Sequence, residues 1–401
     1  MPRMRLTASG RPNNCWEENE GFHPERIEKM GALVSHSDFH LERVLSKSRN
    51  EEPLTKKEIR FLLDLRDEAD LDRFFRAARE IRYRYFGEAI FLYGFVYFST
   101  WCKNNCIFCR YRKSNPLAKR YRKDPREIIE IACRLAESGV HLIDLTMGED
   151  PFFYRNDEGV NCLGDLVQAV KAQTDLPLMV SPGAMPRKML SALYAAGADW
   201  YACYQETHSR KLFRRLRPNQ GYDERLRGKK AARQMGFLIE EGILTGAGDS
   251  CDDIVTSLRA MKTMRARQIR VMTFVPQEGT PLENVPPPSP RRELMIIALM
   301  RILFPDRLIP ASLDVGGIGG LQNRLLAGAN VVTSLIPPDA GLVGVSQSAL
   351  DIDEGYRTAK GVSRVLEKMG LKIATQEEYA QWVLREKGHV IGQDRQTGKI
   401  P

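Results

Sequence analysis

The fold of this chain is decided by a repeating unit that residues 124–149 show in full: DPREIIEIACRLAESGVHLIDLTMGE. The Asp-Pro pair favours the start of a helix, and apolar residues then recur at helical spacing as far as Gly139. Glycine suits the end of a helix because it adopts a left-handed backbone conformation at little cost. The run from Val140 to Glu149 is typical of a buried strand. This segment therefore predicts a helix followed directly by a strand.

The same alternation extends in both directions along the chain. Runs typical of strands stand at 91–100, 140–149, 176–183, 199–207, 242–248, 268–276, 307–315 and 329–338, each followed by a helical pattern. Strands that alternate with helices form right-handed βαβ units and a parallel sheet. Eight such units predict an α/β fold, the closed (β/α)₈ barrel of the TIM type, preceded by an N-terminal helical extension.

Two details of this prediction concern the connections between strands. Gly197, Gly242 and Gly328 precede strands as Gly139 does, and we expect each of them to end a helix. The fourth strand is expected to lead into a basic helical region that ends near Glu241.

The segments outside the barrel are less informative. The chain has 401 residues, 43% of them hydrophobic, which is enough for one large barrel with extensions. Residues 1–54 are polar and are either disordered or a lineage-specific extension. Helices are expected in 55–90, the barrel in 91–375, and a tail without an assigned role in 376–401.

Composition limits the functional classes. No apolar run reaches the roughly 20 residues that span a bilayer, and the first residues lack the apolar core of a secretory signal. We therefore expect a cytoplasmic protein without a membrane partner. The net charge is +9, with basic residues dense in 110–126 and 208–233. We interpret these as solvated surface around small anionic ligands, because no groove-reading element or interleaved aromatic pattern indicates nucleic-acid binding.

The barrel prediction also locates the active site. Barrel enzymes place their catalytic groups at the carboxyl ends of the strands. The polar residues at these ends are Ser99, Thr100, Asp144, Gly148, Glu149, Ser181, Gln205, Glu206, Arg270, Thr273, Ser312, Asp314, Thr333 and Ser334. We expect these side chains to face one common cavity.

Three cysteines follow the first strand at the same end of the barrel. Cys102, Cys106 and Cys109 have the spacing Cys-x₃-Cys-x₂-Cys, and thiolates are the usual ligands of iron–sulfur clusters. Three thiolates on one loop hold three irons of a 4Fe–4S cluster and leave the fourth iron open. A structural zinc remains an alternative if a fourth ligand comes from elsewhere. The other five of the eight cysteines are scattered and read as small buried apolar residues.

This motif resembles that of the radical S-adenosylmethionine (SAM) superfamily. The resemblance implies that SAM chelates the open iron and that one electron cleaves it, releasing a 5′-deoxyadenosyl radical. It implies cofactor contacts from Phe108 to adenine and from Gly148 and Glu149 to the methionyl amino group. Simple loop packing and an ordinary strand-end turn are the alternatives for these residues.

One branch of the superfamily, with biotin synthase and the hydrogenase-maturation enzymes, adds two more contacts. Glu206 in the YQET motif and Arg225 resemble the glutamate and arginine that contact SAM in that branch. Their basic neighbours Arg214, Arg215 and Arg217 are expected to be solvated.

Further segments, including RLIPASLD and MTFVPQEGTPL, resemble the 3-methylornithine synthase family of pyrrolysine biosynthesis. The resemblance covers about residues 68–376. It implies a radical SAM isomerase that converts L-lysine to (3R)-3-methyl-D-ornithine, in the first step of that pathway. The radical abstracts a side-chain hydrogen, and the carbon skeleton fragments and recombines as a branched isomer. The resemblance implies no catalytic residue beyond the cluster and the SAM-derived radical.

The same resemblance implies the substrate contacts. Arg270 clamps the α-carboxylate with help from Ser312, Asp314 pairs with the α-ammonium, and Asp144 pairs with the side-chain ammonium. Alternatives remain for each residue. Arg270 and Asp314 could form an ion pair with each other, Asp144 could cap a helix or orient an arginine, and Ser312 could bond to backbone.

Two other functions stay open at this point. One is another biotin synthase-like or hydrogenase-maturation-like radical SAM enzyme acting on a different small amino acid. The other is a basic RNA-binding protein with a structural metal site. The main interpretation implies L-lysine as the small-molecule partner and a reducing electron donor such as flavodoxin or ferredoxin. It implies no nucleic-acid partner.

Overall fold

The computed structural model describes residues 36–154, 157–337 and 357–396. The chain divides into two compact units, residues 1–42 and 43–401. Within the polar extension predicted at 1–54, residues 1–35 lie outside the described residues, and α1 (His36–Arg49) is a helix. The remaining elements belong to the larger unit.

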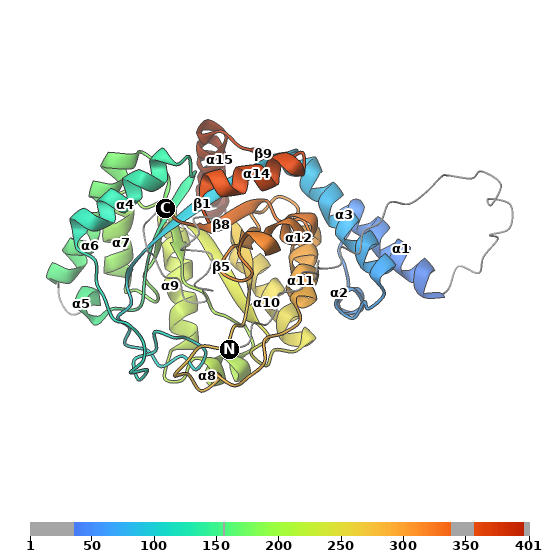
Figure 1. Ribbon diagram of the computed structural model, residues 1–401, viewed down its shortest axis with the longest axis horizontal. Helices are drawn as coiled ribbons and strands as arrows, with labels where there is room; N and C mark the ends of the chain where they lie inside the picture. The colour runs from blue at the N-terminus through green and yellow to red at the C-terminus, as the bar shows by residue number, and fades with distance from the viewer. Residues whose placement is uncertain (1–35, 155–156, 338–356, 397–401) are drawn as a thin grey trace, which may run out of the picture. The chain divides into compact units, whose positions relative to one another are not determined.

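Eight parallel strands form a nearly closed barrel, as the sequence predicts (Figure 1). In chain order they are β1 (Ala89–Ser99), β2 (Leu142–Met147), β3 (Leu178–Ser181), β4 (Trp200–Ala202), β5 (Leu238–Thr245), β6 (Gln268–Thr273), β7 (Pro310–Ser312) and β8 (Val331–Leu335). Their spatial order is β6-β5-β4-β3-β2-β1-β8-β7, and the single parallel bridge between Gln268 and Leu308 joins the two edges. The (β/α)₈ prediction is therefore confirmed.

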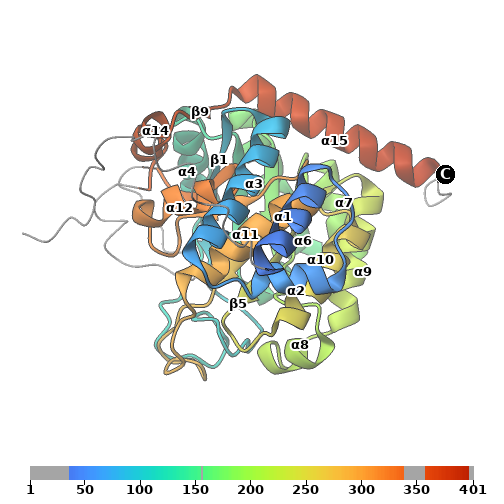
Figure 2. The same cartoon turned by 90° about the vertical axis from the view of Figure 1, so that its right-hand side faces the viewer.

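Helices surround this barrel (Figure 2). They are α4 (Pro125–Glu137), α5 (Pro151–Tyr154), α6 (Asp157–Thr174), α7 (Arg187–Ala195), α8 (Arg210–Leu216), α9 (Tyr222–Met235), α10 (Cys251–Met264), α11 (Pro290–Leu303), α12 (Leu321–Leu326) and α14 (Ala359–Lys368), with the 3₁₀ turn η2 (Ile318–Gly320). The Asp124 side chain accepts a hydrogen bond from the Glu127 N–H at the start of α4, and Pro125 is its first residue, as predicted. None of the described helices is both long and apolar enough to cross a membrane.

The N-terminal helices agree with the pattern in the sequence. They are α2 (Lys56–Leu63) and α3 (Glu68–Phe86). Thr55 caps α2 in a reciprocal capping box with Glu58, which satisfies two backbone N–H groups at the helix start. α3 packs against α11 on the outside of the barrel.

The connection between β4 and β5 differs from the prediction. α9 ends at Met235 and β5 begins at Leu238, so Glu240 and Glu241 lie in a buried strand and not at the end of a basic helix. Gly236, with φ +107°, ends α9, and Gly242 lies inside β5. Two adjacent glutamates after a basic stretch are typical of an exposed helix end, which explains the wrong prediction. In the structure each of them is fully buried beside a cation from another element.

The other predicted helix ends are confirmed. Gly139, Gly197 and Gly328 have φ values of +89°, +100° and +105°, in the region that favours glycine.

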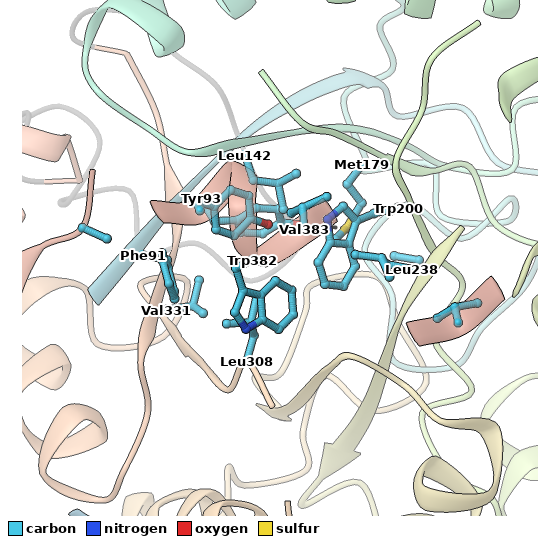
Figure 3. Packing of buried hydrophobic residues seen from close by; sticks show 14 residues of the cluster. Phe91, Tyr93, Leu142, Met179, Trp200, Leu238, Leu308, Val331, Trp382 and Val383 are labelled. Carbon is cyan, nitrogen blue, oxygen red and sulfur yellow. Dashed lines mark hydrogen bonds between the residues drawn. The ribbon is translucent and has the colours of Figure 1, made fainter. Parts of the chain in front are cut away.

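The C-terminal segment forms a floor for the barrel. β9 (Lys372–Ile373) pairs with β1, and α15 (Gln376–Gln396) follows it. In Figure 2, α15 lies at one end of the barrel, and α8 and the loops lie at the other. Trp382 stacks on Trp200 of β4, with ring centroids 5.9 Å apart and planes 3° from parallel. Figure 3 shows this cluster, which contains apolar side chains from most of the barrel strands.

Candidate active site

A cavity of about 280 Å³ opens at the carboxyl ends of the strands. It is lined by all the residues predicted to hold the cluster, the cofactor or the substrate: Cys102, Cys106, Phe108, Cys109, Asp144, Gly148, Glu149, Glu206, Arg225, Arg270, Ser312 and Asp314. Among the other strand-end polar residues, Ser181, Thr273 and Ser334 line it as predicted, whereas the prediction is wrong for Ser99, Thr100, Gln205 and Thr333. These residues come from widely separated parts of the chain. The barrel brings them together because parallel strands end on the same side.

β1 leads directly into the cysteine loop, where Cys102, Cys106 and Cys109 are free thiols. Cys106 Sγ accepts hydrogen bonds from Arg217 Nη1 at 3.4 Å and from Gln220 Nε2 at 3.0 Å. Burial raises the pKa of Cys102 and of Cys109, and the neighbouring sulfurs raise both further. Three thiolates here therefore need a strongly cationic group to hold them together.

The arrangement fits an iron–sulfur cluster better than a single zinc ion. Within residues 36–154, 157–337 and 357–396, no three His, Cys, Asp or Glu side chains converge to hold one metal ion. In a cluster, each iron takes its own thiolate, so the sulfurs need not meet at one point. Zinc requires that convergence.

The turn after β2 is built against the cysteine loop. A Cβ atom on Gly148 would lie 2.3 Å from the carbonyl oxygen of Trp101, so only glycine fits there. The Gly148 N–H donates to the Ser99 carbonyl at 2.9 Å, and the Lys103 N–H donates to the Glu149 carbonyl at 3.0 Å. Glycine at this position thus lets the turn lie against the backbone of the cysteine loop, which couples the turn to the cysteines.

Glu149 and Arg225 form a buried ion pair at the cavity. Arg225 Nη1 lies 2.7 Å from Glu149 Oε1, which also accepts the Ala184 N–H at 3.0 Å. Burial alone would raise the pKa of Glu149, but Arg225 and the Ala184 N–H hold it below its usual value. Arg225 Nη2 donates to the Tyr204 carbonyl at 2.9 Å, which fixes the guanidinium in the cavity wall.

Glu206 pairs with Arg217 and not with Arg225. Arg217 Nη2 lies 2.5 Å from Glu206 Oε1, and the Arg217 guanidinium lies 5.5 Å from the centre of the Phe108 ring. Glu206 has φ +64°, a strained conformation for a residue with a side chain.

The prediction that Arg217 is solvated is therefore wrong, whereas Arg214 and Arg215 are exposed as predicted. Arg217 is only 8% exposed because the chain leaves α8 at this residue and turns inward. Arg217 stands four residues after the buried Phe213, just beyond the end of α8, and this spacing is the sequence signal that could have found it.

Arg270 on β6 is anchored by Glu240 of the neighbouring strand β5. Arg270 Nε donates to Glu240 Oε1 at 2.6 Å, and Arg270 Nη2 is buried without a hydrogen-bond partner. The rings of Tyr93 and Tyr204 each have their centres 5.5 Å from the guanidinium. Although burial opposes it, Glu240 keeps the pKa of Arg270 above its usual value. The alternative ion pair between Arg270 and Asp314 is wrong.

Asp314 has a different cation as its partner. Arg357 Nη2 donates to Asp314 Oδ1 at 2.7 Å, and the hydroxyls of Ser334 and Ser312 reach Asp314 Oδ2 at 2.7 and 3.1 Å. Arg357 outweighs the effect of burial and lowers the pKa of Asp314. Arg357 is 1% exposed, and no spacing in the sequence marks it as a site residue.

Among the described residues, the hydrogen bonds that Asp144 accepts all come from hydroxyl groups. They come from Tyr93 at 2.8 Å, Ser181 at 2.7 Å and Thr146. No cation in the described part of the chain lies within ion-pair distance of it, and it neither caps a helix nor orients an arginine. Burial raises the pKa of Asp144 to about 6, and the nearby Glu240 contributes to the same shift.

The charges around this half of the cavity do not cancel. Glu240 is neutralised by Arg270 and Asp314 by Arg357, while Asp144 lacks a cation. At neutral pH, above the pKa of about 6, Asp144 carries a negative charge. The cavity therefore offers a site for one additional positive charge.

The comparisons with known proteins fit this geometry. Residues 96–274 match the Radical SAM superfamily. The chain is 47% identical over 326 residues to the 3-methylornithine synthase of Methanosarcina barkeri, covering 81% of this chain and 92% of that protein. It is 45% identical to the 3-methylornithine synthase of Methanosarcina acetivorans, covering 83% and 93%. It also resembles a crystal structure of methylornithine synthase, with a TM-score of 0.80, 45% identity and coverage of 84% and 99%.

A parallel barrel with three cysteines at its mouth, matched over 96–274, defines an enzyme of the radical SAM class, which uses a 4Fe–4S cluster and SAM. Within that class, the chain belongs to the 3-methylornithine synthase family. It acts as an isomerase through radical SAM chemistry on a small-molecule substrate. The maturation-like and RNA-binding alternatives are not favoured by these matches.

Proposed function

We propose that this chain binds L-lysine with its α-amino-acid end at Arg270 and Asp314 and its distal ammonium at Asp144, and converts it to (3R)-3-methyl-D-ornithine. The observation that carries the proposal is the unpaired charge of Asp144. Lysine has two ammonium groups and one carboxylate, a net charge of +1. That charge matches the one carboxylate of the cavity that lacks a cation.

The α-amino-acid end of lysine fits the other two residues. The free Nη2 of Arg270 offers a charge-assisted hydrogen bond to the α-carboxylate. Asp314, fixed by Arg357, accepts from the α-ammonium, and the Ser312 hydroxyl lies beside it. The distal ammonium then reaches Asp144, whose three hydroxyl partners hold the carboxylate still.

The cofactor half of the cavity holds the remaining residues. We assign Cys102, Cys106 and Cys109 as the ligands of the cluster, which with SAM supplies a 5′-deoxyadenosyl radical when both are bound. For SAM we assign Phe108, Gly148, Glu149, Glu206 and Arg225, which line the same cavity. Glu149 offers a carboxylate to an ammonium, and Arg225 offers a guanidinium to a carboxylate.

The side chains of the protein position the substrate and confine its fragments in the cavity. Tyr93 and Tyr204 form walls beside Arg270, and their phenols stay neutral because burial raises the pKa of each. Walls of this kind exclude water, and they prevent two fragments of one substrate from separating before they recombine. The electron donor, flavodoxin or ferredoxin, and the cytoplasmic location stay predictions.

The direct test is turnover of the anaerobically reconstituted enzyme with L-lysine, SAM and dithionite. We expect an isobaric branched product, identified by mass spectrometry and NMR after derivatisation. Unchanged lysine with accumulating 5′-deoxyadenosine would show that another substrate is the true one.

Two variants separate the halves of the site. Arg270→Ala should abolish product formation while the absorbance of the cluster stays intact. Cys106→Ala should bind less iron than the wild type and lose SAM cleavage. Loss of the cluster in Arg270→Ala would instead make Arg270 a structural residue.

A further inference from the structure

Exposed apolar side chains gather on the outer side of the cysteine loop. Trp101 is 46% exposed and lies next to Cys102, Leu117 is 53% exposed, and Phe152 after the Gly148 turn is 44% exposed. The only other large apolar side chains with high exposure in the described residues are Tyr83, Tyr85 and Leu384, on α3 and α15. Exposed apolar side chains near the cysteine loop therefore indicate a binding surface.

Backbone pairing and contacts between arginines and rings connect Trp101 and Phe152 to the segment 113–122, which carries Leu117. Ser99 pairs with Arg122 in an antiparallel bridge, and the Tyr121 N–H donates to Thr100 Oγ1 at 2.9 Å. The Arg120 guanidinium lies 6.0 Å from the centre of the Trp101 ring, and that of Arg122 lies 4.5 Å from the Phe152 ring. We call the residues 101–103, 113–122 and 152 the loop surface.

The loop surface is also strongly basic. It contains five Lys and Arg side chains and no acidic residue. Two of the five, Lys103 and Arg122, form ion pairs. Lys113 and Lys119 are exposed and form no ion pair with the described residues. Positive charge around an exposed aromatic centre is the composition of a protein-binding surface with an acidic partner.

The location of the surface indicates what that partner does. The inner side of the cysteine loop lines the cavity, which the proposed function fills with SAM and lysine. An electron for the cluster must therefore arrive through the outer side. Electron-transfer complexes are small and transient, and complementary charge speeds their formation.

We propose that the loop surface is the docking site of an acidic one-electron carrier protein. The proposal rests on the proposed function, since it assumes that a cluster is held by this loop. Nucleic acid is the competing occupant, because its phosphates suit the basic side chains and its bases can stack on Trp101 and Phe152, but only transfer of an electron explains why the surface lies beside the cysteine loop.

The test compares two reductants on the reconstituted enzyme. Reduced flavodoxin, an acidic carrier, must dock, whereas dithionite is small and need not. The test variant is Lys113→Glu/Lys119→Glu. The matched control is Lys262→Glu/Lys368→Glu, which reverses two exposed charges near the ends of α10 and α14 that face away from the mouth of the barrel.

Stopped-flow absorbance at low salt should show that the loop variant is reduced by flavodoxin about tenfold more slowly than the wild type. The control variant should match the wild type, and all three should turn over lysine at similar rates with dithionite. Added salt should slow the flavodoxin reaction of the wild type and of the control variant, but not that of the loop variant.

Three outcomes would overturn the proposal. In the first, the loop variant reacts with flavodoxin as fast as the wild type. In the second, it loses the dithionite-driven reaction as well, which would assign the lysines to holding the cluster. In the third, the wild type binds an RNA oligonucleotide through these lysines and does not bind flavodoxin. Failure of the proposed function would appear separately, as absence of the lysine product with dithionite in the wild type.

Discussion

The two ends of the barrel interior differ in almost every physical property. The mouth contains ion pairs, hydroxyls and three thiols around a cavity of about 280 Å³. The floor, closed by α15, contains stacked and tightly packed apolar side chains such as Trp200, Tyr379 and Trp382 (Figure 3). Both ends are built from the same strands, so polar and apolar surroundings are separated by only a few residues along each strand.

Tyr93 marks the boundary between the two ends. Its ring belongs to the apolar cluster of the floor, while its hydroxyl donates to Asp144 at 2.8 Å. The packed floor therefore provides stability, which allows the mouth to bury charges that are costly for folding. Substitutions at the floor should therefore change stability, and those at the mouth should change activity.

The largest effect is expected at the floor. Trp382→Ala should lower the free energy of unfolding by about 3–5 kcal/mol, because it removes a buried ring that stacks on Trp200. The KM for lysine should change less than about twofold. Urea unfolding followed by circular dichroism measures the effect. Leu384→Ala, at a residue of the same helix that is 69% exposed, is the control and should stay within about 0.5 kcal/mol. Equal unfolding midpoints for the two variants would disprove the role of the floor.

The next effect is expected at the mouth. Asp144→Asn removes the proposed partner of the distal ammonium but keeps the shape of the side chain. We expect kcat/KM for lysine to fall roughly 30- to 1000-fold, which corresponds to a rise of about 2–4 kcal/mol in the activation free energy. The free energy of unfolding should not fall, because the variant removes a buried charge that has no cation. Steady-state kinetics with dithionite checks this. A tenfold lower equilibrium constant for folding, with unchanged kinetics, would show that Asp144 serves stability and not activity.

A smaller effect is expected from the residue that orients Arg270. Glu240→Gln keeps an oxygen for Arg270 Nε but removes the charge. We expect the KM for lysine to rise about tenfold, or about 1.4 kcal/mol. A looser carboxylate clamp should also raise the ratio of 5′-deoxyadenosine to product, which chromatography measures. An unchanged ratio and KM would show that Glu240 only fills the barrel.

The smallest effect concerns pH. The pKa of Asp144 is raised to about 6, and lysine binds its ionised form, so kcat/KM should fall about tenfold per pH unit below pH 6 and be level above it. Glu149 and Asp314 do not titrate in this range because their cation partners lower the pKa of each. The acid limb should disappear in Asp144→Asn. Its persistence there would assign the titration to another group.

Stability should respond to pH with the opposite sign. Because the folded pKa of Asp144 lies above its unfolded value of about 3.8, the folded state binds the extra proton between about pH 4 and 6. This residue therefore makes the empty enzyme more stable as pH falls through 6, while substrate binding weakens.

Local sequence patterns were enough to predict the barrel, the cysteine loop and most of the polar residues that line the cavity. Local patterns carry this information, because helix and strand periods, the Asp124 cap and the spacing of the three cysteines involve neighbouring residues. The rule that parallel strands end on one side then brings distant residues such as Asp144 and Asp314 into one cavity.

The pairing of the charges and the closure of the floor depend on contacts between distant parts of the chain. Arg270 pairs with Glu240, Glu206 with Arg217, and Asp314 with Arg357. Which buried charges pair depends on their distance in the folded barrel. Asp314 and Arg357 are 43 residues apart in the chain, so no periodic pattern in the sequence indicates that they pair. The same holds for α15, whose apolar side chains reveal their role only against the strands they cover.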